Sequence, residues 1–202
     1  FSKNKKISET QPLKPINPYG FSKLYAEQSI EQYAKSYNLN YIILRYFNAA
    51  GADQECEIGE DHSPETHLIP IIIDALIKNK TLKVYGSDFN TIDGTGVRDY
   101  IHVDDLASAH YFALKKILYS SSSTIINLGA EKGYSVKQII QLSEKIFNKK
   151  IKIKYYPKRK GDVAKLISSS KKAKKILGWS PKKSDLKNIL ITAYNWYLKN
   201  NK

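Results

Sequence analysis

A tyrosine and a lysine stand four residues apart in the segment Asn17-Pro18-Tyr19-Gly20-Phe21-Ser22-Lys23. Asn17 is a favourable helix N-cap and Pro18 suits the first helical position, which predicts a helix with Tyr19 and Lys23 on one face. An unperturbed phenol ionises near pH ~10, and an ammonium group one turn away favours the phenolate. Such a tyrosine can act as a general base near neutral pH. The competing interpretation is a packed tyrosine beside a lysine whose stem covers apolar surface.

Two later segments favour the catalytic interpretation. The first is Leu44-Arg45-Tyr46-Phe47-Asn48, and the second is Gly96-Val97-Arg98-Asp99-Tyr100-Ile101-His102-Val103-Asp104-Asp105. Together with the tyrosine segment they resemble the extended short-chain dehydrogenase/reductase family, and within it the sugar-nucleotide 4-epimerases. The resemblance covers essentially all 202 residues.

The resemblance implies an NAD-dependent isomerase of nucleotide-sugar metabolism. In the family mechanism, Tyr19 takes the proton of the sugar 4-hydroxyl and the C4 hydride passes to tightly held NAD. The 4-keto sugar then turns over and is reduced on its other face, which interconverts UDP-glucose and UDP-galactose. Lys23 would lower the pKa of Tyr19 and bind the nicotinamide ribose, and Tyr46 would also line the cofactor. The resemblance further implies a homodimer that pairs through the Tyr19 helix.

Arginine is rare in this chain, so each one draws attention. Of the 33 basic residues only Arg45, Arg98 and Arg159 are arginines. The planar guanidinium binds phosphate through two parallel hydrogen bonds, which a lysine cannot do. The resemblance implies that Arg98 and Arg159 grip the diphosphate of a UDP-sugar and that Asp162 binds the uridine ribose. The alternative for both arginines is an ion pair with Asp99 or Asp162, and Arg45, on a predicted buried strand, is expected to be structural.

Further substrate contacts are expected at the ends of predicted strands and at one helix start. Asn48 directly follows a strand, where doubly wound sheets bind their ligands; its alternative is a turn residue. By resemblance, His67 and Leu68 would contact phosphate, with histidine standing where asparagine is more familiar. The strand residues Lys83 and Tyr85 would hold uracil, although Tyr85 also suits a half-buried strand position.

Leu166 bears on which sugars fit. The resemblance places it on the wall beside the C2 substituent, where a tyrosine in relatives restricts turnover to UDP-glucose and UDP-galactose. Leucine is shorter, so we expect the N-acetylated pair, UDP-GlcNAc and UDP-GalNAc, to be accepted as well. The alternative is an ordinary core leucine.

Composition excludes several other classes of protein. The net charge of +14 comes from scattered lysines without the glycine and aromatic pattern of an RNA module, so we expect no nucleic-acid partner. The single cysteine, Cys56, favours a reducing compartment and hence the cytoplasm. The four histidines show no metal-ligand spacing, so no metal is expected, and His102 is interpreted as structural. No apolar run is long enough to span a membrane.

The elements that position these residues alternate between helix and strand, which predicts the α/β class. We expect a partial Rossmann-like, doubly wound parallel sheet and a smaller α/β lobe that covers a sugar nucleotide. Residues 1–47 and 103–128 would belong to the NAD-binding domain, and residues 48–102 and 129–202 to the UDP-sugar lobe. The predicted helices are 18–38, 68–78, 103–119, 135–148, 171–177 and 184–199; the predicted strands are 41–47, 82–85, 97–102, 125–128 and 151–155; loops are expected over 1–16 and 48–66.

One family feature has no counterpart in these 202 residues. The sequence contains no methionine and no G-x-G-x-x-G turn, which in this family cradles the dinucleotide pyrophosphate. We therefore expect an N-terminally truncated member that alone neither binds NAD tightly nor turns over substrate. The alternatives are a sugar-nucleotide 4,6-dehydratase of the same family and a non-catalytic remnant.

Overall fold

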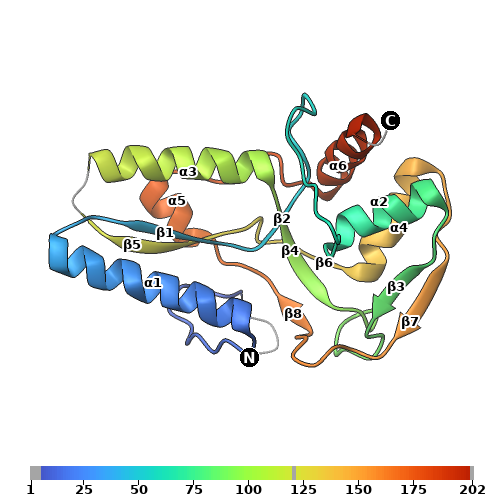
Figure 1. Cartoon of the computed structure of the whole chain (residues 1–202), viewed down its shortest axis with the longest axis horizontal. Helices are drawn as coiled ribbons and strands as arrows, with labels where there is room; N and C mark the ends of the chain where they lie inside the picture. Colours follow the sequence, from blue (N-terminus) through green and yellow to red (C-terminus); the bar gives the residue numbers. More distant parts are fainter. Residues whose placement is uncertain (1–5, 120–121, 201–202) are drawn as a thin grey trace.

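The computed structural model describes residues 6–119 and 122–200. The predicted loop over residues 1–16 therefore lies partly outside the described residues. Figure 1 shows two groups of elements joined by a small central sheet. One group contains α1, α3, α5, β1 and β5, and the other contains α2, α4, α6, β3 and β7. Each group encloses its own cluster of buried apolar side chains.

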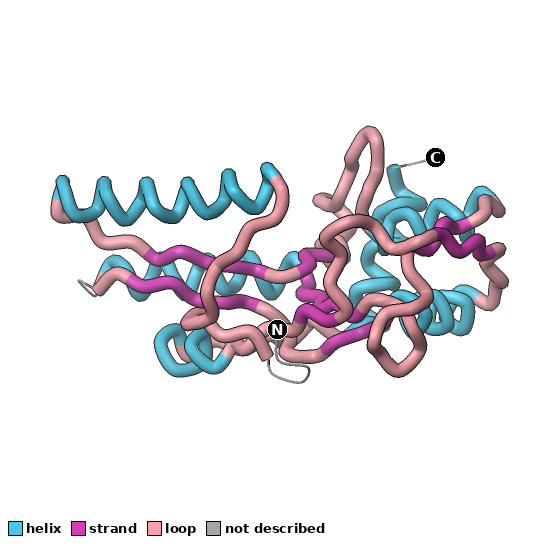
Figure 2. Tube along the Cα trace, turned by 90° about the horizontal axis from the view of Figure 1, so that it is seen from below, coloured by secondary structure: helices cyan, strands magenta, loops and turns pink. Residues whose placement is uncertain are grey.

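The first group is built on a parallel strand pair. β1 (Ile42–Tyr46) runs parallel to β5 (Thr124–Leu128), with Leu44 opposite Ile126. α1 (Pro18–Tyr37) and α5 (Lys171–Leu177) lie along opposite sides of this pair (Figure 2), and α3 (Val103–Leu118) packs against β1. A strand pair covered by helices buries apolar runs, which accounts for the sequence Ile-Ile-Leu in β1.

The start and end of α1 follow its sequence. The side chain of Asn17 accepts a hydrogen bond of 2.8 Å from the Gly20 amide, and Asn38 ends the helix in the left-handed conformation. The face that carries Tyr19 and Lys23 is exposed, however, and no residue of α1 is buried. It comprises Tyr19, Lys23, Ala26, Ile30, Tyr33 and Tyr37. The helix instead contacts β1 through a narrow stripe that includes Glu27, whose carboxylate holds Arg45 at 2.7 and 2.5 Å.

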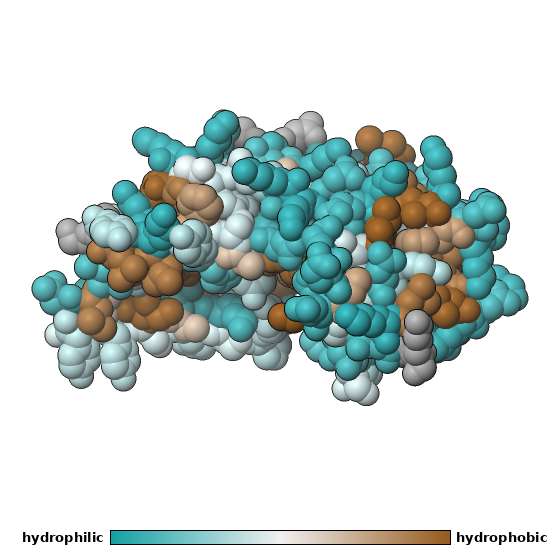
Figure 3. All heavy atoms as spheres, turned by 90° about the horizontal axis from the view of Figure 1, so that it is seen from above, coloured by the Kyte–Doolittle hydropathy of each residue, from teal (hydrophilic) through white to brown (hydrophobic). Residues whose placement is uncertain are grey.

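Apolar side chains also remain exposed on α3. Figure 3 shows the molecule from above the view of Figure 1. Two main apolar patches lie on this face, with hydrophilic surface between them. The large exposed side chains of α3 are Tyr111, Phe112, Leu114 and Leu118. The inner face of the same helix packs Leu106, Ala109 and Ala113 into the core of the first group.

The central sheet joins the two groups. β2 (Asn48–Ala50) pairs in parallel with β4 (Val97–His102), which also pairs with β6 (Gly133–Ser135) and β8 (Lys165–Leu166). The sequence prediction placed a loop from residue 48 onward and included neither β6 nor β8. Strands of two or three residues are too short to display an alternating pattern, so pairing with β4 decides their conformation.

The second group packs three helices beside a two-stranded parallel sheet. β3 (Leu82–Tyr85) pairs with β7 (Ile153–Tyr156), and α2 (Leu68–Lys78), α4 (Val136–Phe147) and α6 (Leu186–Asn200) enclose the larger core. Ser135 and Gln138 form a capping box at the start of α4. α2 is apolar along most of its length because it packs into this core and against α6.

The predicted α/β class is confirmed by the parallel pairs β1–β5, β2–β4 and β3–β7 and by their helices. The position of α5 differs from the predicted division of the chain, which assigned this helix to the sugar-nucleotide lobe. Its Ala173 and Leu177 pack with α3 and β5 in the core of the first group. Among the described residues, no helix is both long and apolar enough to cross a membrane.

A buried carboxylate holds the central sheet to its surroundings. Asp99 of β4 is fully buried and accepts four hydrogen bonds. They come from the Ala130 amide (2.9 Å), the Glu131 amide (3.1 Å), the Ser168 amide (3.0 Å) and the Ser168 hydroxyl (2.5 Å). Burial raises the pKa of Asp99, and these donors act in the opposite direction.

We predict that Asp99→Ala strongly destabilises the chain, by on the order of 3 kcal/mol, because it leaves several buried donors without an acceptor. Asp99→Asn should cost less, since its amide oxygen can still accept most of these bonds. The measurement is the free energy of unfolding in urea. Asp61→Ala, at an exposed side chain, serves as the control and should change stability by less than about 0.5 kcal/mol. Equal stabilities of Asp99→Ala and the control would contradict this role.

Candidate functional site

The predicted proton-transfer pair lies at the exposed start of α1. The Tyr19 side chain is 70% exposed, and the Lys23 ammonium nitrogen lies 5.1 Å from the centroid of its ring. Within the described chain neither side chain takes part in a salt bridge or a side-chain hydrogen bond. Both side chains are therefore accessible to a ligand, and the ammonium of Lys23 lies over the Tyr19 ring.

A loop from the far end of the chain approaches the start of α1. A Cβ atom added at Gly161 would lie 2.8 Å from Cδ1 of Ile16, so the Ile16 side chain packs closely against the Gly161 backbone. Gly161 also has a φ of +88°, a conformation that glycine adopts without strain. The contact brings the segment containing Arg159 and Asp162 towards Tyr19. The sequence analysis did not single out Ile16 or Gly161, since a contact across this sequence separation leaves no local pattern.

Arg98 is the more enclosed of the two predicted diphosphate ligands. Its Nη1 donates to the carbonyls of Val97 and Val163, each at 2.9 Å, which fixes the guanidinium on β4. Burial lowers the pKa of Arg98, and the nearby carboxylate of Asp162 raises it. Arg98 lies opposite Leu166 in the parallel ladder between β4 and β8. The alternative ion pair between Arg98 and Asp99 is not formed.

Tyr100 lies beside Arg98 on β4. It is 5% exposed, and burial raises its pKa to about 12 although the Arg98 charge acts to lower it. Tyr100 therefore stays a neutral phenol at ordinary pH, and the positive charge of Arg98 is not cancelled there.

Arg159 is more exposed and lies over an aromatic side chain. Its guanidinium carbon is 5.3 Å from the centroid of the Tyr85 ring, and its Nε donates to Asp162 at 3.0 Å. The alternative ion pair is thus present for Arg159, and it is largely solvent-exposed, so its contribution to stability is small. The structure brings Tyr85, Arg159 and Asp162 together from β3 and the loop after β7, as predicted.

The remaining predicted contacts lie at strand ends. Tyr46 is the last residue of β1 and is 53% exposed, and Asn48 begins β2 opposite Tyr100. Lys83 projects from β3 with its ammonium nitrogen 5.9 Å from the centroid of the Tyr156 ring. Asn48 is in a strand and not in the turn that was its alternative.

His67 and Leu68 lie at the start of α2, as predicted. His67 is the N-cap residue, but its side chain makes no capping hydrogen bond. Its imidazole instead contacts Glu60 and Glu65, and His62 lies against the same carboxylates. The spacing of the histidines in the sequence predicts no metal centre. The loop nevertheless brings the side chains of Glu60, His62, Glu65 and His67 together.

The structure also agrees with two structural assignments. His102 is fully buried; its Nδ1 accepts from the Asp104 amide at the start of α3, and its Nε2 lies 3.1 Å from the Thr192 hydroxyl. Burial lowers the pKa of His102, which favours the neutral imidazole. Arg45 makes the two-bond ion pair with Glu27 and is a structural residue.

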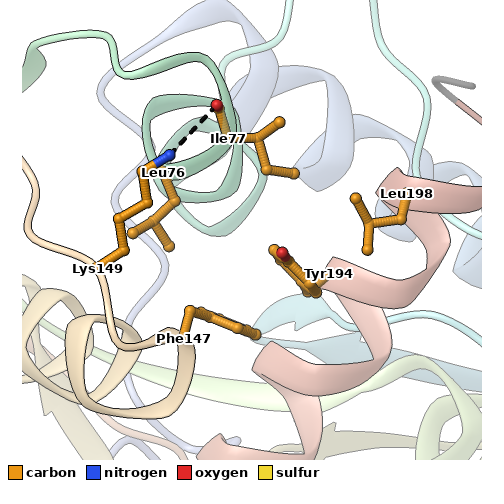
Figure 4. A pocket seen from close by; sticks show the side chains of 6 residues that line it. All are labelled: Leu76, Ile77, Phe147, Lys149, Tyr194 and Leu198. Carbon is orange, nitrogen blue, oxygen red and sulfur yellow. Dashed lines mark hydrogen bonds between the residues drawn. The ribbon is translucent and has the colours of Figure 1, made fainter.

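A cavity of about 210 Å³ lies between α2, the end of α4 and α6 (Figure 4). It is lined by Leu76, Ile77, Phe147, Lys149, Tyr194 and Leu198. The Lys149 side chain closes one side by donating to the Ile77 carbonyl at 3.4 Å. None of the predicted site residues lines this cavity, whose two ionisable side chains are Lys149 and Tyr194.

Comparison with known proteins finds a family and similar enzymes. The NAD dependent epimerase/dehydratase family matches residues 2–129. The chain is 46% identical over 192 residues to a UDP-glucose 4-epimerase of Halalkalibacterium halodurans, covering 95% of this chain and 58% of the relative. The chain thus spans less than two thirds of the length of that relative.

Solved structures show the same arrangement of elements. The crystal structure of a UDP-glucose 4-epimerase from Bifidobacterium longum in complex with NAD⁺ and UDP has a TM-score of 0.91 at 36% identity and covers 98% of this chain and 60% of that one. A UDP-Glc/GlcNAc 4-epimerase from Campylobacter jejuni has a TM-score of 0.78 at 37% identity, again over 98% of this chain and 60% of the other.

Proposed function

The chain belongs to the NAD-dependent epimerase/dehydratase family, and from this premise we propose that it supplies the proton-transfer pair and the sugar-nucleotide lobe of a UDP-hexose 4-epimerase. The observation that carries the proposal is the contact between Ile16 and Gly161. It joins the helix that bears Tyr19 and Lys23 to the loop that bears Arg159 and Asp162. A general base thereby lies beside a set of cationic and aromatic groups suited to a nucleoside diphosphate.

In this proposal the chain's own residues perform binding, orientation and proton transfer. The Tyr19 hydroxyl accepts the proton of the sugar 4-hydroxyl and later returns one to the same oxygen. The Lys23 ammonium, which lies against the Tyr19 ring, donates to ribose hydroxyls. Arg98 and Arg159 neutralise the diphosphate, while Asp162 and Tyr85 hold the ribose and the base.

The residues present fit part of an NAD site. The free phenol of Tyr19, the free ammonium of Lys23 and the exposed Tyr46 suit a nicotinamide ribose. When bound, NAD supplies the acceptor and donor of the C4 hydride. A glycine-rich turn for the pyrophosphate is not found among the 202 residues. We assign residues 1–47 and 103–128 to the cofactor side and residues 48–102 and 129–202 to the sugar-nucleotide side, except that α5 packs with α3 and β5 on the cofactor side.

Two other functions are compatible with the family resemblance. A sugar-nucleotide 4,6-dehydratase needs an extra acid/base pair, which we expect beside a serine or threonine that precedes the Tyr19 helix in sequence. A non-catalytic remnant would not need an exposed Tyr19 with Lys23 beside its ring. The 46% identity to a UDP-glucose 4-epimerase favours the epimerase over both.

We also propose that two copies pair through α1. The helix buries none of its residues, and Tyr25, Tyr33 and Tyr37 are each more than 60% exposed. Tyr33 and Tyr37 stack with their ring centroids 5.7 Å apart, which makes a flat aromatic surface. Exposed aromatic surface on one helix suits a symmetric helix–helix interface.

A prediction for catalysis concerns Tyr19 and is tested in the complete protein that the gene encodes. Tyr19→Phe should lower kcat by roughly 10²- to 10⁴-fold while Kd for UDP changes little, because only proton transfer is removed. The measurement is turnover of UDP-galactose together with UDP titration. Tyr25→Phe, six residues along the same helix, is the matched control and should keep full activity. Normal turnover of Tyr19→Phe would return Tyr19 to the packing interpretation.

A prediction for substrate binding concerns Arg98 and Arg159, and its test needs UDP as the only ligand. Arg98→Lys and Arg159→Lys should each weaken UDP binding by about 1–3 kcal/mol, or roughly 5- to 150-fold in Kd, because lysine keeps the charge but loses the paired hydrogen bonds. Calorimetric titration measures it. Arg45→Lys, at the structural ion pair, should leave the Kd unchanged. If all three variants bind UDP alike, the diphosphate lies elsewhere.

Leu166 supports a proposal about sugar choice. It is half-buried on β8 directly opposite Arg98, so its side chain belongs to the wall next to the proposed diphosphate site. A leucine there leaves more room than a tyrosine. We propose that UDP-GlcNAc and UDP-GalNAc are accepted along with UDP-glucose and UDP-galactose. Similarity to a UDP-Glc/GlcNAc 4-epimerase supports this dual range.

Leu166→Tyr should therefore lose activity on UDP-GlcNAc selectively and retain activity on UDP-glucose. The quantity to compare is the ratio of kcat/KM for the two substrates, since discrimination is a difference in transition-state binding. Leu166→Met, of similar volume, should preserve the wild-type ratio. Absence of any UDP-GlcNAc turnover by the wild type would end the proposal on sugar choice and leave the epimerase assignment standing.

A further inference from the structure

Four side chains with metal-binding chemistry meet in the loop before α2. Glu60, His62, Glu65 and His67 each offer one ligand atom, and these atoms all lie within 4.8 Å of one another. Two imidazoles and two carboxylates form a mixed nitrogen and oxygen donor set. We call these four residues the loop cluster.

The contacts within the loop cluster are mutual. Nδ1 of His62 lies 3.0 Å from Oε1 of Glu60 and 3.9 Å from Oε2 of Glu65. Nδ1 of His67 lies 3.2 Å from Oε1 of Glu65 and also contacts Oε1 of Glu60. Both imidazoles thus direct the same ring nitrogen at the same two carboxylates, so the four donors face a common point.

The charge of the loop cluster is unusual for this chain. The net charge is +14, yet over residues 6–119 and 122–200 no lysine or arginine forms a salt bridge with Glu60 or Glu65. Two carboxylates held this close repel each other unless a cation or a proton lies between them. In the described part of the chain the two imidazoles are the groups that pair with these carboxylates, and imidazoles are themselves metal ligands.

The backbone holds the loop cluster in place. The indole nitrogen of Trp196 donates to the Glu60 carbonyl at 2.9 Å, and a Cβ at Gly59 would overlap the same indole ring. Oε1 of Glu65 accepts from the amides of Thr66 (2.6 Å) and His67 (2.7 Å). Little conformational freedom would be lost on binding an ion, because α6 and the start of α2 already fix this part of the loop.

We propose that the loop cluster binds one divalent transition-metal ion of the Zn²⁺ class. Zinc takes imidazole nitrogens and carboxylate oxygens in tetrahedral sites, whereas Mg²⁺ and Ca²⁺ prefer oxygen ligands alone. Metal–ligand bonds of about 2.0–2.2 Å put neighbouring ligand atoms roughly 3.3–3.5 Å apart. Three of the four imidazole–carboxylate distances, 3.0, 3.2 and 3.9 Å, bracket this value, whereas His67 lies closer to Glu60 and would have to move apart from it. The half-exposed imidazoles can rotate to close these differences.

A bound ion would clasp the loop to α2 and α6. Coordination through Nδ1 of His67 puts the ring proton on Nε2, which stays free to donate to an anion such as the proposed diphosphate. The metal site itself does not rest on the proposed epimerase function. Its test uses metal binding and thermal stability, which stay informative whatever the enzyme assay shows.

The test is a calorimetric titration of the 202-residue chain with ZnCl₂, together with metal analysis after dialysis. We expect one Zn²⁺ per chain and no binding of Mg²⁺. His62→Ala and Glu65→Gln should each weaken Zn²⁺ binding, by roughly 100-fold or more for the loss of a direct ligand. Both variants should fold, because His62 is exposed and its contacts are with the carboxylates of Glu60 and Glu65 and with the His67 ring. In Glu65→Gln the new side-chain amide oxygen can still accept the two backbone hydrogen bonds.

Three controls separate the loop cluster from adventitious binding. His110→Ala on α3, Glu57→Gln in the same loop and Cys56→Ala should all bind Zn²⁺ as the wild type does. Zn²⁺ at about 100 times its Kd should raise Tm by about 5–10 °C in the wild type and these controls, and not in His62→Ala. The proposal is overturned if the wild type binds no Zn²⁺, if His62→Ala and Glu65→Gln bind it normally, or if Cys56→Ala alone abolishes binding.

Discussion

The arrangement of the whole chain depends on the buried carboxylate of Asp99. An ionised group is costly to bury unless donors surround it, and here four donors from two separate segments do so. The Ala130 and Glu131 amides follow β5, and Ser168 follows β8. Because each donor must be in place for the carboxylate to be tolerated, this one group sets the positions of both segments relative to β4.

The two faces of β4 carry polar side chains with different partners. Neighbouring side chains on a strand point in opposite directions, so Asp99 faces inward while Arg98 and Tyr100 face the other way. The strand then runs into His102, which caps α3, and Asp105 just beyond it accepts from Lys182, Lys183 and Ser184. A single continuous segment thus anchors the C-terminal part of the chain and presents the guanidinium proposed to bind diphosphate.

The proposed site is assembled from elements that are distant in sequence. Tyr19 belongs to a helix that packs weakly on its own sheet, and Arg159 belongs to a loop stacked over Tyr85 of β3. The close approach of Ile16 and Gly161 joins them. On the other side, the loop cluster lies at the start of α2, where His67 belongs both to the proposed metal site and to the proposed phosphate contact. The proposed site thus depends on contacts between segments that are distant in sequence, of which the one between Ile16 and Gly161 is nearest to Tyr19 along the chain.

The sequence by itself determined most of the local structure. Asn17-Pro18 and the capping box at Ser135 mark helix starts through hydrogen bonds within a few residues, and the apolar run at β1 identifies a covered parallel strand. The three segments that carry the family resemblance, and the scarcity of arginine, also identify Tyr19, Lys23, Arg98 and Arg159 as candidate site residues from the sequence alone.

Only the tertiary structure decided the outward orientation of α1, the short strands β2, β6 and β8, and the gathering of the loop cluster. A periodic pattern shows which residues share a helix face but not whether that face meets a sheet, and here Glu27 and Arg45 turn the opposite stripe inward. Histidines and glutamates at positions 60, 62, 65 and 67 match no helical or strand repeat, so their meeting depends on how the loop folds against Trp196. These contacts join residues far apart in the chain, and their energies have no signature in local sequence.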